Sequence, residues 1–209
     1  MDDFREKAKM PHPVDIHVGR RVRKRRVELG FSQAQLAPKL GVIYQQLHKY
    51  ECGSNRVSAS RLFQIAQVLG VTPSFFFDGY EPPTTGRWFA EPPAKTADAD
   101  LMRLRGAVKL VKRSIDDPAL RGNPHPIDIH VGRRVSERRA ELGFSREWLA
   151  AELGVGYHQV WKYELAVNRI SAGRLFDIAK LFDVEPSFFF EGYEPPATRP
   201  RVRRTAGRS

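Results

Sequence analysis

The chain has 209 residues, of which 41% are hydrophobic and 11% aromatic, and its formal net charge is +11. This composition is typical of a folded protein of one or two domains and excludes a largely disordered chain. No apolar run approaches the ~20 residues of a membrane-spanning helix, and the charged first ten residues do not resemble a secretory signal. The single cysteine, Cys52, excludes an intramolecular disulfide and agrees with a reducing cytoplasm. The positive charge favours a polyanionic partner.

Two segments of the chain repeat one another without a gap. Residues 11–83 and 124–196 align at a constant offset of 113 positions, with 48 identities in 73 positions. Segments this similar share one fold, and each is long enough to build its own small core. The chain is therefore a tandem duplication of copy 1 (11–83) and copy 2 (124–196), with a linker over 84–123 and a tail over 197–209.

Capping residues and apolar spacing predict the first helices of copy 1. Asp15 is expected to cap a first helix that ends at Gly30. Ser32 is expected to cap a second helix over 33–40, which stops at Gly41. Only a few residues then separate the second helix from a third.

The third helix is predicted over about 44–51, with Leu47 and Tyr50 facing inward. Ser58 opens a fourth helix, and Thr72-Pro73 fits the start of a fifth. The apolar stripe of the fourth helix comprises Leu62, Ile65, Ala66 and Leu69. Five short helices without a strand pattern predict an all-α domain, and copy 2 is expected to share it.

A tight glycine turn after a capped start, SQAQLA, is typical of a helix-turn-helix. Together with LGV, KYE and the later SASRLFQIAQVL, it resembles the Xre family, which includes the lambdoid phage repressors and Cro. The pattern KYExGxNRV and the closing SFFF are similar to an alphaproteobacterial branch of these regulators. The resemblance covers nearly all of each copy, and it implies two tandem five-helix, lambda-repressor-like domains joined by a partly helical linker.

The resemblance also implies which residues contact double-stranded DNA. In this family the third helix lies in the major groove, with its N-terminal residues at base edges. By position, the expected base readers of copy 1 are Tyr44, Gln45 and Lys49, and Gln46 and His48 flank them. Gln33 matches a family position that contacts the phosphate backbone, and Arg56, in the loop after the third helix, is a further candidate for phosphate or the minor groove. The alternative for all of them is the solvated face of an amphipathic helix.

The basic run over 20–26, RRVRKRR, places six cations in seven positions of the first helix. Because the cations go all round the helix, only some can face phosphate. For each of these cations, a position in solvent and a contact with phosphate are equally compatible with the sequence. A collective electrostatic contribution to DNA binding is expected.

The linker contains a further amphipathic segment. Apolar residues at Leu101, Leu104, Val108, Val111 and Ile115 have 3-4-3-4 spacing, which predicts a helix over about 98–115. This helix packs either on its own chain or on the equivalent helix of another, which would allow self-association. The tail over 197–209 carries five arginines and is expected to be disordered, either along phosphates or in solvent.

Copy 2 differs from copy 1 in charge and in its expected readers. Copy 1 has ten basic and five acidic residues, whereas copy 2 has nine and eleven, so their net charges are +5 and −2. The expected DNA contacts of copy 2 are Arg146, Tyr157, His158, Gln159, Lys162 and Arg169. Trp148 and Trp161 have no aromatic counterparts in copy 1. Each either extends the core or rests on the surface, and for Trp161 the alternative is a place in an interface.

These patterns favour a regulator over an enzyme. No nucleophile–base pair, phosphate loop or paired-carboxylate site is recognisable, and the six histidines lack cysteine partners, so no catalytic site, metal or cofactor is expected. The resemblance implies a sequence-specific transcriptional regulator, by family expectation a repressor, in the bacterial cytoplasm and associated with the nucleoid.

Three functional hypotheses follow. A flexible 40-residue linker has a root-mean-square span of ~35 Å, close to the ~34 Å between half-sites one turn apart. The two copies can therefore form a covalent pseudo-dimer on an asymmetric operator. The alternative is a protein-interaction module or antitoxin-like adaptor in which only copy 1 binds DNA. A non-specific nucleoid or RNA-binding protein comes third.

Overall fold

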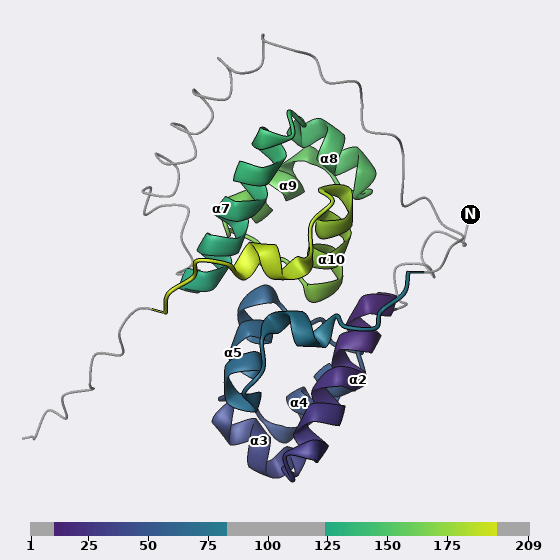
Figure 1. Cartoon of the computed structure of the whole chain (residues 1–209), viewed down its shortest axis with the longest axis vertical. Coiled ribbons are helices and arrows are strands. Elements are labelled where there is room, and N and C mark those ends of the chain that lie inside the picture. The colour runs from purple at the N-terminus through teal and green to yellow at the C-terminus, as the bar shows by residue number, and fades with distance from the viewer. Residues whose placement is uncertain (1–10, 83–123, 196–209) are drawn as a thin grey trace, which may run out of the picture.

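The computed structural model describes residues 11–82 and 124–195 (Figure 1). Both ranges are helical, and the only β pairing within them is an isolated antiparallel bridge between Ser58 and Ser171. The all-α prediction is therefore confirmed. The predicted linker helix over 98–115 and the tail over 197–209 lie outside the described residues.

Each copy contains four α-helices and one 3-10 helix in the described ranges. In copy 1 these are α2 (Pro13–Glu28), α3 (Gln33–Lys39), α4 (Tyr44–Glu51), α5 (Ala59–Leu69) and the 3-10 helix η2 (Pro73–Phe76). In copy 2 they are α7 (Pro126–Glu141), α8 (Arg146–Glu152), α9 (Tyr157–Glu164), α10 (Ala172–Leu181) and η4 (Pro186–Phe190). The fifth predicted helix is thus a short 3-10 segment.

The start of the first helix differs from the prediction. His12, not Asp15, is the N-cap of α2, and its Nδ1 accepts a hydrogen bond from the Val14 N–H at 3.3 Å. Pro13 occupies the first helical position, where its missing N–H costs nothing. Asp15 therefore lies inside the first turn, and its carboxylate is available for a contact outside copy 1.

The two predicted serine caps are confirmed, whereas Thr72, the N-cap residue of η2, makes no capping hydrogen bond with its side chain. Ser32 accepts a hydrogen bond from Gln35 N, and the Gln35 side chain accepts one from Ser32 N, which completes a capping box at α3. Ser58 caps α5 through the N–H of Arg61. The core of copy 1 includes the fully buried side chains of Val18, Val22, Leu36, Leu47, Leu62, Ile65 and Phe76.

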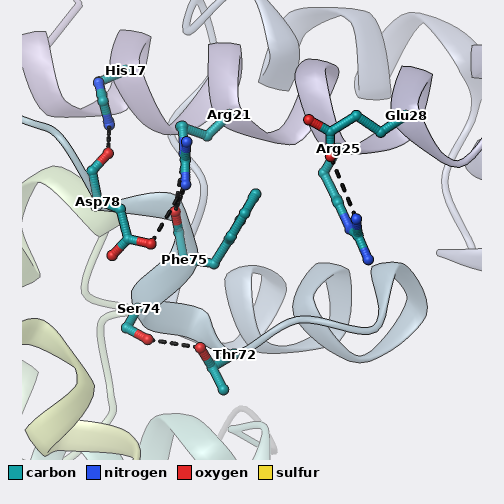
Figure 2. A network of polar contacts seen from close by, with 8 residues as sticks. All are labelled: His17, Arg21, Arg25, Glu28, Thr72, Ser74, Phe75 and Asp78. Atoms are coloured by element: carbon teal, nitrogen blue, oxygen red, sulfur yellow. Dashed lines mark hydrogen bonds and ion pairs between the residues drawn. The ribbon is translucent and has the colours of Figure 1, made fainter.

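Part of the basic run over 20–26 braces copy 1 internally (Figure 2). The Arg21 guanidinium donates to the Phe75 carbonyl at 3.0 and 2.8 Å and lies 4.1 Å from the centre of the Phe75 ring. Arg25 donates to the Leu69 carbonyl at 3.3 Å. Arg21 and Arg25 therefore hold α2 against η2 and the end of α5. The exposed cations of the run are Arg20, Arg23 and Lys24.

The two copies pack against each other through the same surface of each (Figure 1). The Asp15 carboxylate accepts a hydrogen bond from the Gly173 N–H at 3.0 Å, and the Asp128 carboxylate accepts one from the Ser60 N–H at 3.1 Å. Asp15 and Asp128 are equivalent in the repeat, as are Ser60 and Gly173. Each copy thus offers the other the same donor and acceptor, as in an isologous dimer interface.

Further pairs extend this interface, which we call the inter-copy seam. At its centre the Ser58–Ser171 bridge joins two residues that are equivalent in the repeat. On either side, aromatic rings stack reciprocally. The pairs are Phe63 with Phe190, 6.3 Å between centroids, and Phe77 with Phe176, 6.2 Å. Polar contacts and apolar packing therefore both obey one approximate two-fold relation.

Candidate nucleic-acid interface

The predicted recognition helix of copy 1 is α4, and its polar residues point away from the core. Tyr44, Gln45, His48 and Lys49 are exposed, and Gln46 is half-buried. On the opposite side of α4, Leu47 is fully buried and Tyr50 is 9% exposed. The sequence prediction of inward and outward faces is therefore confirmed, while DNA contact by the outward residues stays a prediction.

Close backbone packing fixes the position of α4 and α9. A Cβ atom on Gly19 of α2 would lie 2.4 Å from the Tyr50 carbonyl oxygen, and one on Gly132 of α7 would lie 2.5 Å from the Tyr163 carbonyl oxygen. Any side chain at either glycine would push the two helices apart. Glycine here lets the long first helix hold the end of the recognition helix directly.

A buried ion pair reinforces this contact in copy 1. The Arg26 guanidinium donates to both carboxylate oxygens of Glu51, at 2.6 and 2.9 Å, and this hydrogen bonding raises the pKa of Arg26. Both side chains are at least nine-tenths buried. The Gln33 side-chain amide donates to the same carboxylate at 2.6 Å. Three helices therefore meet at Glu51, at the last residue of α4.

Copy 2 has an additional cation at the equivalent place. Arg139 donates to Glu164 at 2.6 Å, and Arg146, in place of Gln33, donates to the same carboxylate at 2.6 Å. The predicted phosphate-contacting residues Gln33 and Arg146 thus both hold the end of a recognition helix in this structure. The sequence predicted that both residues lie at the start of the second helix, but it did not predict their contacts with Glu51 and Glu164.

The predicted readers of copy 2 lie on α9 and are less exposed than those of copy 1. Tyr157 and His158 are exposed, whereas Gln159 and Lys162 are half-buried. The side-chain Oε1 of Gln159 accepts a hydrogen bond from the side-chain amide of Asn168 at 3.1 Å. Reading a base with Gln159 would therefore require this bond to open or be shared.

The loop arginines Arg56 and Arg169 are exposed and lie next to the inter-copy seam. The Arg169 Nε is 3.7 Å from the Asp128 carboxylate, while burial raises the pKa of Asp15 and the positive charge of Arg56 opposes only part of that rise. Burial raises the pKa of Asp128 as well. The structure thus brings Arg56 and Arg169, which are 113 residues apart in the sequence, together near the centre of the inter-copy seam.

The structure assigns roles to Trp148 and to two aspartates that the sequence left open or did not indicate. Trp148 stacks on Phe144 with 3.9 Å between centroids and packs against the core, so it extends the core of copy 2. Asp15 and Asp128 were not expected at an interface. One signal in the sequence could have indicated this. Both aspartates lie in the same DIH motif, and the His-Pro pair before each already supplies the cap and the first residue of the helix, so the aspartate is not needed as a cap.

The geometry described above is that of a duplicated helix-turn-helix protein. The helix-turn-helix family model HTH_3 matches residues 22–76 and, a second time, residues 135–189, which is more than half of the chain. The chain therefore belongs to the helix-turn-helix family of Cro/C1 type, with the domain present twice, as the resemblance implied.

Known relatives carry matching descriptions. An uncharacterized HTH-type transcriptional regulator of Sinorhizobium medicae is 56% identical over 73 residues, which are 35% of this chain and 52% of the relative. An uncharacterized transcriptional regulator in the ATPase CF(0) region of Rhodospirillum rubrum is 48% identical over 87 residues, covering 37% of this chain and 81% of the relative. The uncharacterized HTH-type transcriptional regulator y4aM of Sinorhizobium fredii is 51% identical over 78 residues, covering 37% and 54%.

The chain spans about half the length of the first of these relatives. No solved structure matches the chain. Within the two described ranges, none of the helices combines the length and the apolar character needed to cross a membrane. The comparisons thus identify a member of a family of transcriptional regulators.

Proposed function

We propose that this protein is a sequence-specific DNA-binding regulator whose two copies act as a covalent pseudo-dimer on one asymmetric operator. The inter-copy seam carries this proposal, because its reciprocal contacts join the copies as an isologous interface joins two subunits. Dimeric members of this fold use such two-fold symmetry to match two half-sites about one helical turn, ~34 Å, apart. Here the symmetry is contained in one chain.

The operator is expected to be asymmetric because the two recognition helices differ at the positions of Gln45 and His48, which are exposed on α4. Gln45 of α4 corresponds to His158 of α9, and His48 corresponds to Trp161. Glutamine is suited to a bidentate pair with adenine, whereas histidine and tryptophan are not. The half-site facing copy 2 should therefore have a different sequence from the half-site facing copy 1.

The contributions of the copies to affinity are expected to be unequal. Copy 1 has a net charge of +5 and copy 2 of −2, so copy 1 supplies most of the counterion release that drives binding. Binding across a promoter would block polymerase access, so the protein is proposed to be a repressor in the bacterial cytoplasm, at the nucleoid. Self-association through the linker is not needed for this function.

The experiment begins with selection of bound sequences from a random duplex library by the full chain. The expected motif has two parts of different sequence, separated by about one helical turn. Light scattering of the complex on that site should then give one chain per duplex. Two chains on one pair of half-sites would overturn the pseudo-dimer.

Two other results would favour a different function. A motif with a single half-site, protected only by copy 1, would favour the adaptor in which copy 2 makes protein contacts. The acidic balance of copy 2 is the observation behind that alternative. Equal affinity for random and selected duplexes would favour a non-specific nucleic-acid-binding protein.

A further inference from the structure

A polar recess lies on the inter-copy seam, between the ends of the two recognition helices. It has a volume of about 280 Å³, near the lower end for small-ligand sites. Its walls comprise three arginines (Arg56, Arg61 and Arg169), a tyrosine from each recognition helix, and the two serines of the central bridge. Because both copies contribute, the recess exists only when the seam is formed.

The charge in this recess is unevenly compensated. Arg169 has the Asp128 carboxylate 3.7 Å away, and Arg56 interacts electrostatically with Asp15. Both aspartates are buried in the seam, with exposed fractions of 4% and 1%. Two of the three arginines are therefore partly compensated by a carboxylate of their own copy.

Arg61 has no such carboxylate beside it in the described part of the chain, and a comparison with its counterpart in copy 2, Arg174, shows why. Each arginine donates to the carbonyl at the end of the preceding second helix: Arg61 to Leu40 at 2.7 Å, and Arg174 to Leu153 at 2.8 Å. Arg174 is also 3.4 Å from the Asp177 carboxylate, three residues further along its helix. Copy 1 has Gln64 at that position, so Arg61 lacks the nearby carboxylate that Arg174 has.

The chemistry of the recess suits an anion with several acceptor oxygens. Guanidinium groups present planar pairs of donors that match phosphate oxygens, and the hydroxyl groups of tyrosine and serine add single donors. We propose that this recess binds a phosphate group, with Arg61 as the principal cation. Arg56 and Arg169 are also among the expected DNA contacts, whereas Arg61 is not, so the proposal is tested at Arg61.

Two sources can supply the phosphate: a free phosphorylated small molecule or the DNA backbone. Calorimetric titration of the full chain with pyrophosphate, in a chloride buffer, tests the first. We expect saturable binding that Arg61→Gln weakens about tenfold or more, as loss of a charge-assisted hydrogen bond predicts. The matched control is Arg174→Gln, which loses the same type of carbonyl bond but does not line the recess, and it should change the affinity less than about twofold.

The second source is tested with random-sequence duplex DNA over a range of salt concentrations. If pyrophosphate does not bind, Arg61→Gln should lower the slope of log affinity against log salt by about 1, and Arg174→Gln should leave it unchanged. That result would assign the site to the DNA backbone. If neither pyrophosphate nor the DNA slope responds to Arg61, the proposal is overturned.

Folding is monitored by circular dichroism for both variants. Should Arg61→Gln unfold, Arg61→Lys keeps the charge but loses the paired donors, and it should bind pyrophosphate or DNA phosphate with intermediate strength. If Arg61→Lys is folded and binds as tightly as the unmodified chain, the role of the guanidinium is overturned. Pyrophosphate titration requires no operator, so its outcome is separate from that of the proposed regulatory function.

Discussion

Asp15 and Gly173 lie 158 residues apart in the chain, yet the Asp15 carboxylate accepts a hydrogen bond from the Gly173 N–H at 3.0 Å. Gly173 is the second residue of α10, so a carboxylate from copy 1 helps to cap a helix of copy 2. The reciprocal bond from Ser60 N–H to Asp128 caps α5 in the same way. Each copy therefore completes a helix N-terminus of the other.

The first prediction tests the seam at Gly173. A Cβ atom there would lie 2.7 Å from Nδ1 of His12, whose Nε2 is 3.3 Å from the Asp177 carboxylate. Gly173→Ala should displace the imidazole and destabilise the protein by about 1–3 kcal/mol in chemical unfolding. Ser60→Ala is the matched control, since it keeps the Cβ and should cost under about 1 kcal/mol. Equal costs for the two variants would contradict this account of the seam.

The second prediction concerns base reading by Gln45. If Gln45 pairs with a base, Gln45→Ala should reduce discrimination at one base pair by about 1–3 kcal/mol and leave binding to random duplex unchanged. Competition binding with operators altered at single positions measures this effect. His158→Ala should relax the sequence requirement in the other half-site instead. A uniform loss on specific and random DNA would rule out a reading role for Gln45.

The third prediction compares the buried ion pairs that hold the recognition helices. Arg26→Ala leaves the buried Glu51 carboxylate with the neutral amide of Gln33, and should cost about 3–5 kcal/mol in the free energy of unfolding. The equivalent Arg139→Ala should cost less, because Arg146 still lies 2.6 Å from Glu164.

Urea unfolding of both single variants measures this difference. Arg23→Ala, on the exposed face of the same helix, should change the stability by under about 0.5 kcal/mol. A larger loss for Arg139→Ala than for Arg26→Ala would show that Arg146 does not compensate.

The fourth prediction concerns pH. Burial lowers the pKa of His17 and of His130 below the ordinary 6.5, although the imidazole of each lies within hydrogen-bonding distance of a carbonyl, those of Asp78 and Glu191. A lowered pKa in the folded state means that the unfolded chain binds more protons below pH 6.5. These histidines therefore contribute stability that is complete above pH 6.5 and is lost as the pH falls towards their lowered pKa.

Thermal melts between pH 7.5 and 5.5 check this sign. The double variant with His17→Gln and His130→Gln should lose less stability across that interval than the unmodified chain does. The comparison between the two proteins cancels the titration of all other groups. If the two proteins lose stability in parallel as the pH falls, burial of these imidazoles does not contribute to the pH dependence of stability.

The fold was largely predictable because its signals are local. The serine caps at Ser32 and Ser58 and the spacing of buried side chains on α4 and α5 depend on residues within one helix or one turn. The family resemblance depends on the same short motifs, and the match of HTH_3 to both copies confirms it.

The partners of polar side chains were decided by tertiary structure. Arg21 and Arg26 belong to one basic run, but one holds a carbonyl of η2 and the other holds the buried Glu51. Asp15 was expected to cap its own helix and instead caps a helix of the other copy. The energy of a hydrogen bond or ion pair depends on a distance of a few ångströms between residues far apart in sequence. Helix positions can therefore be inferred from local patterns, whereas these contacts, and the seam they form, require the packed structure.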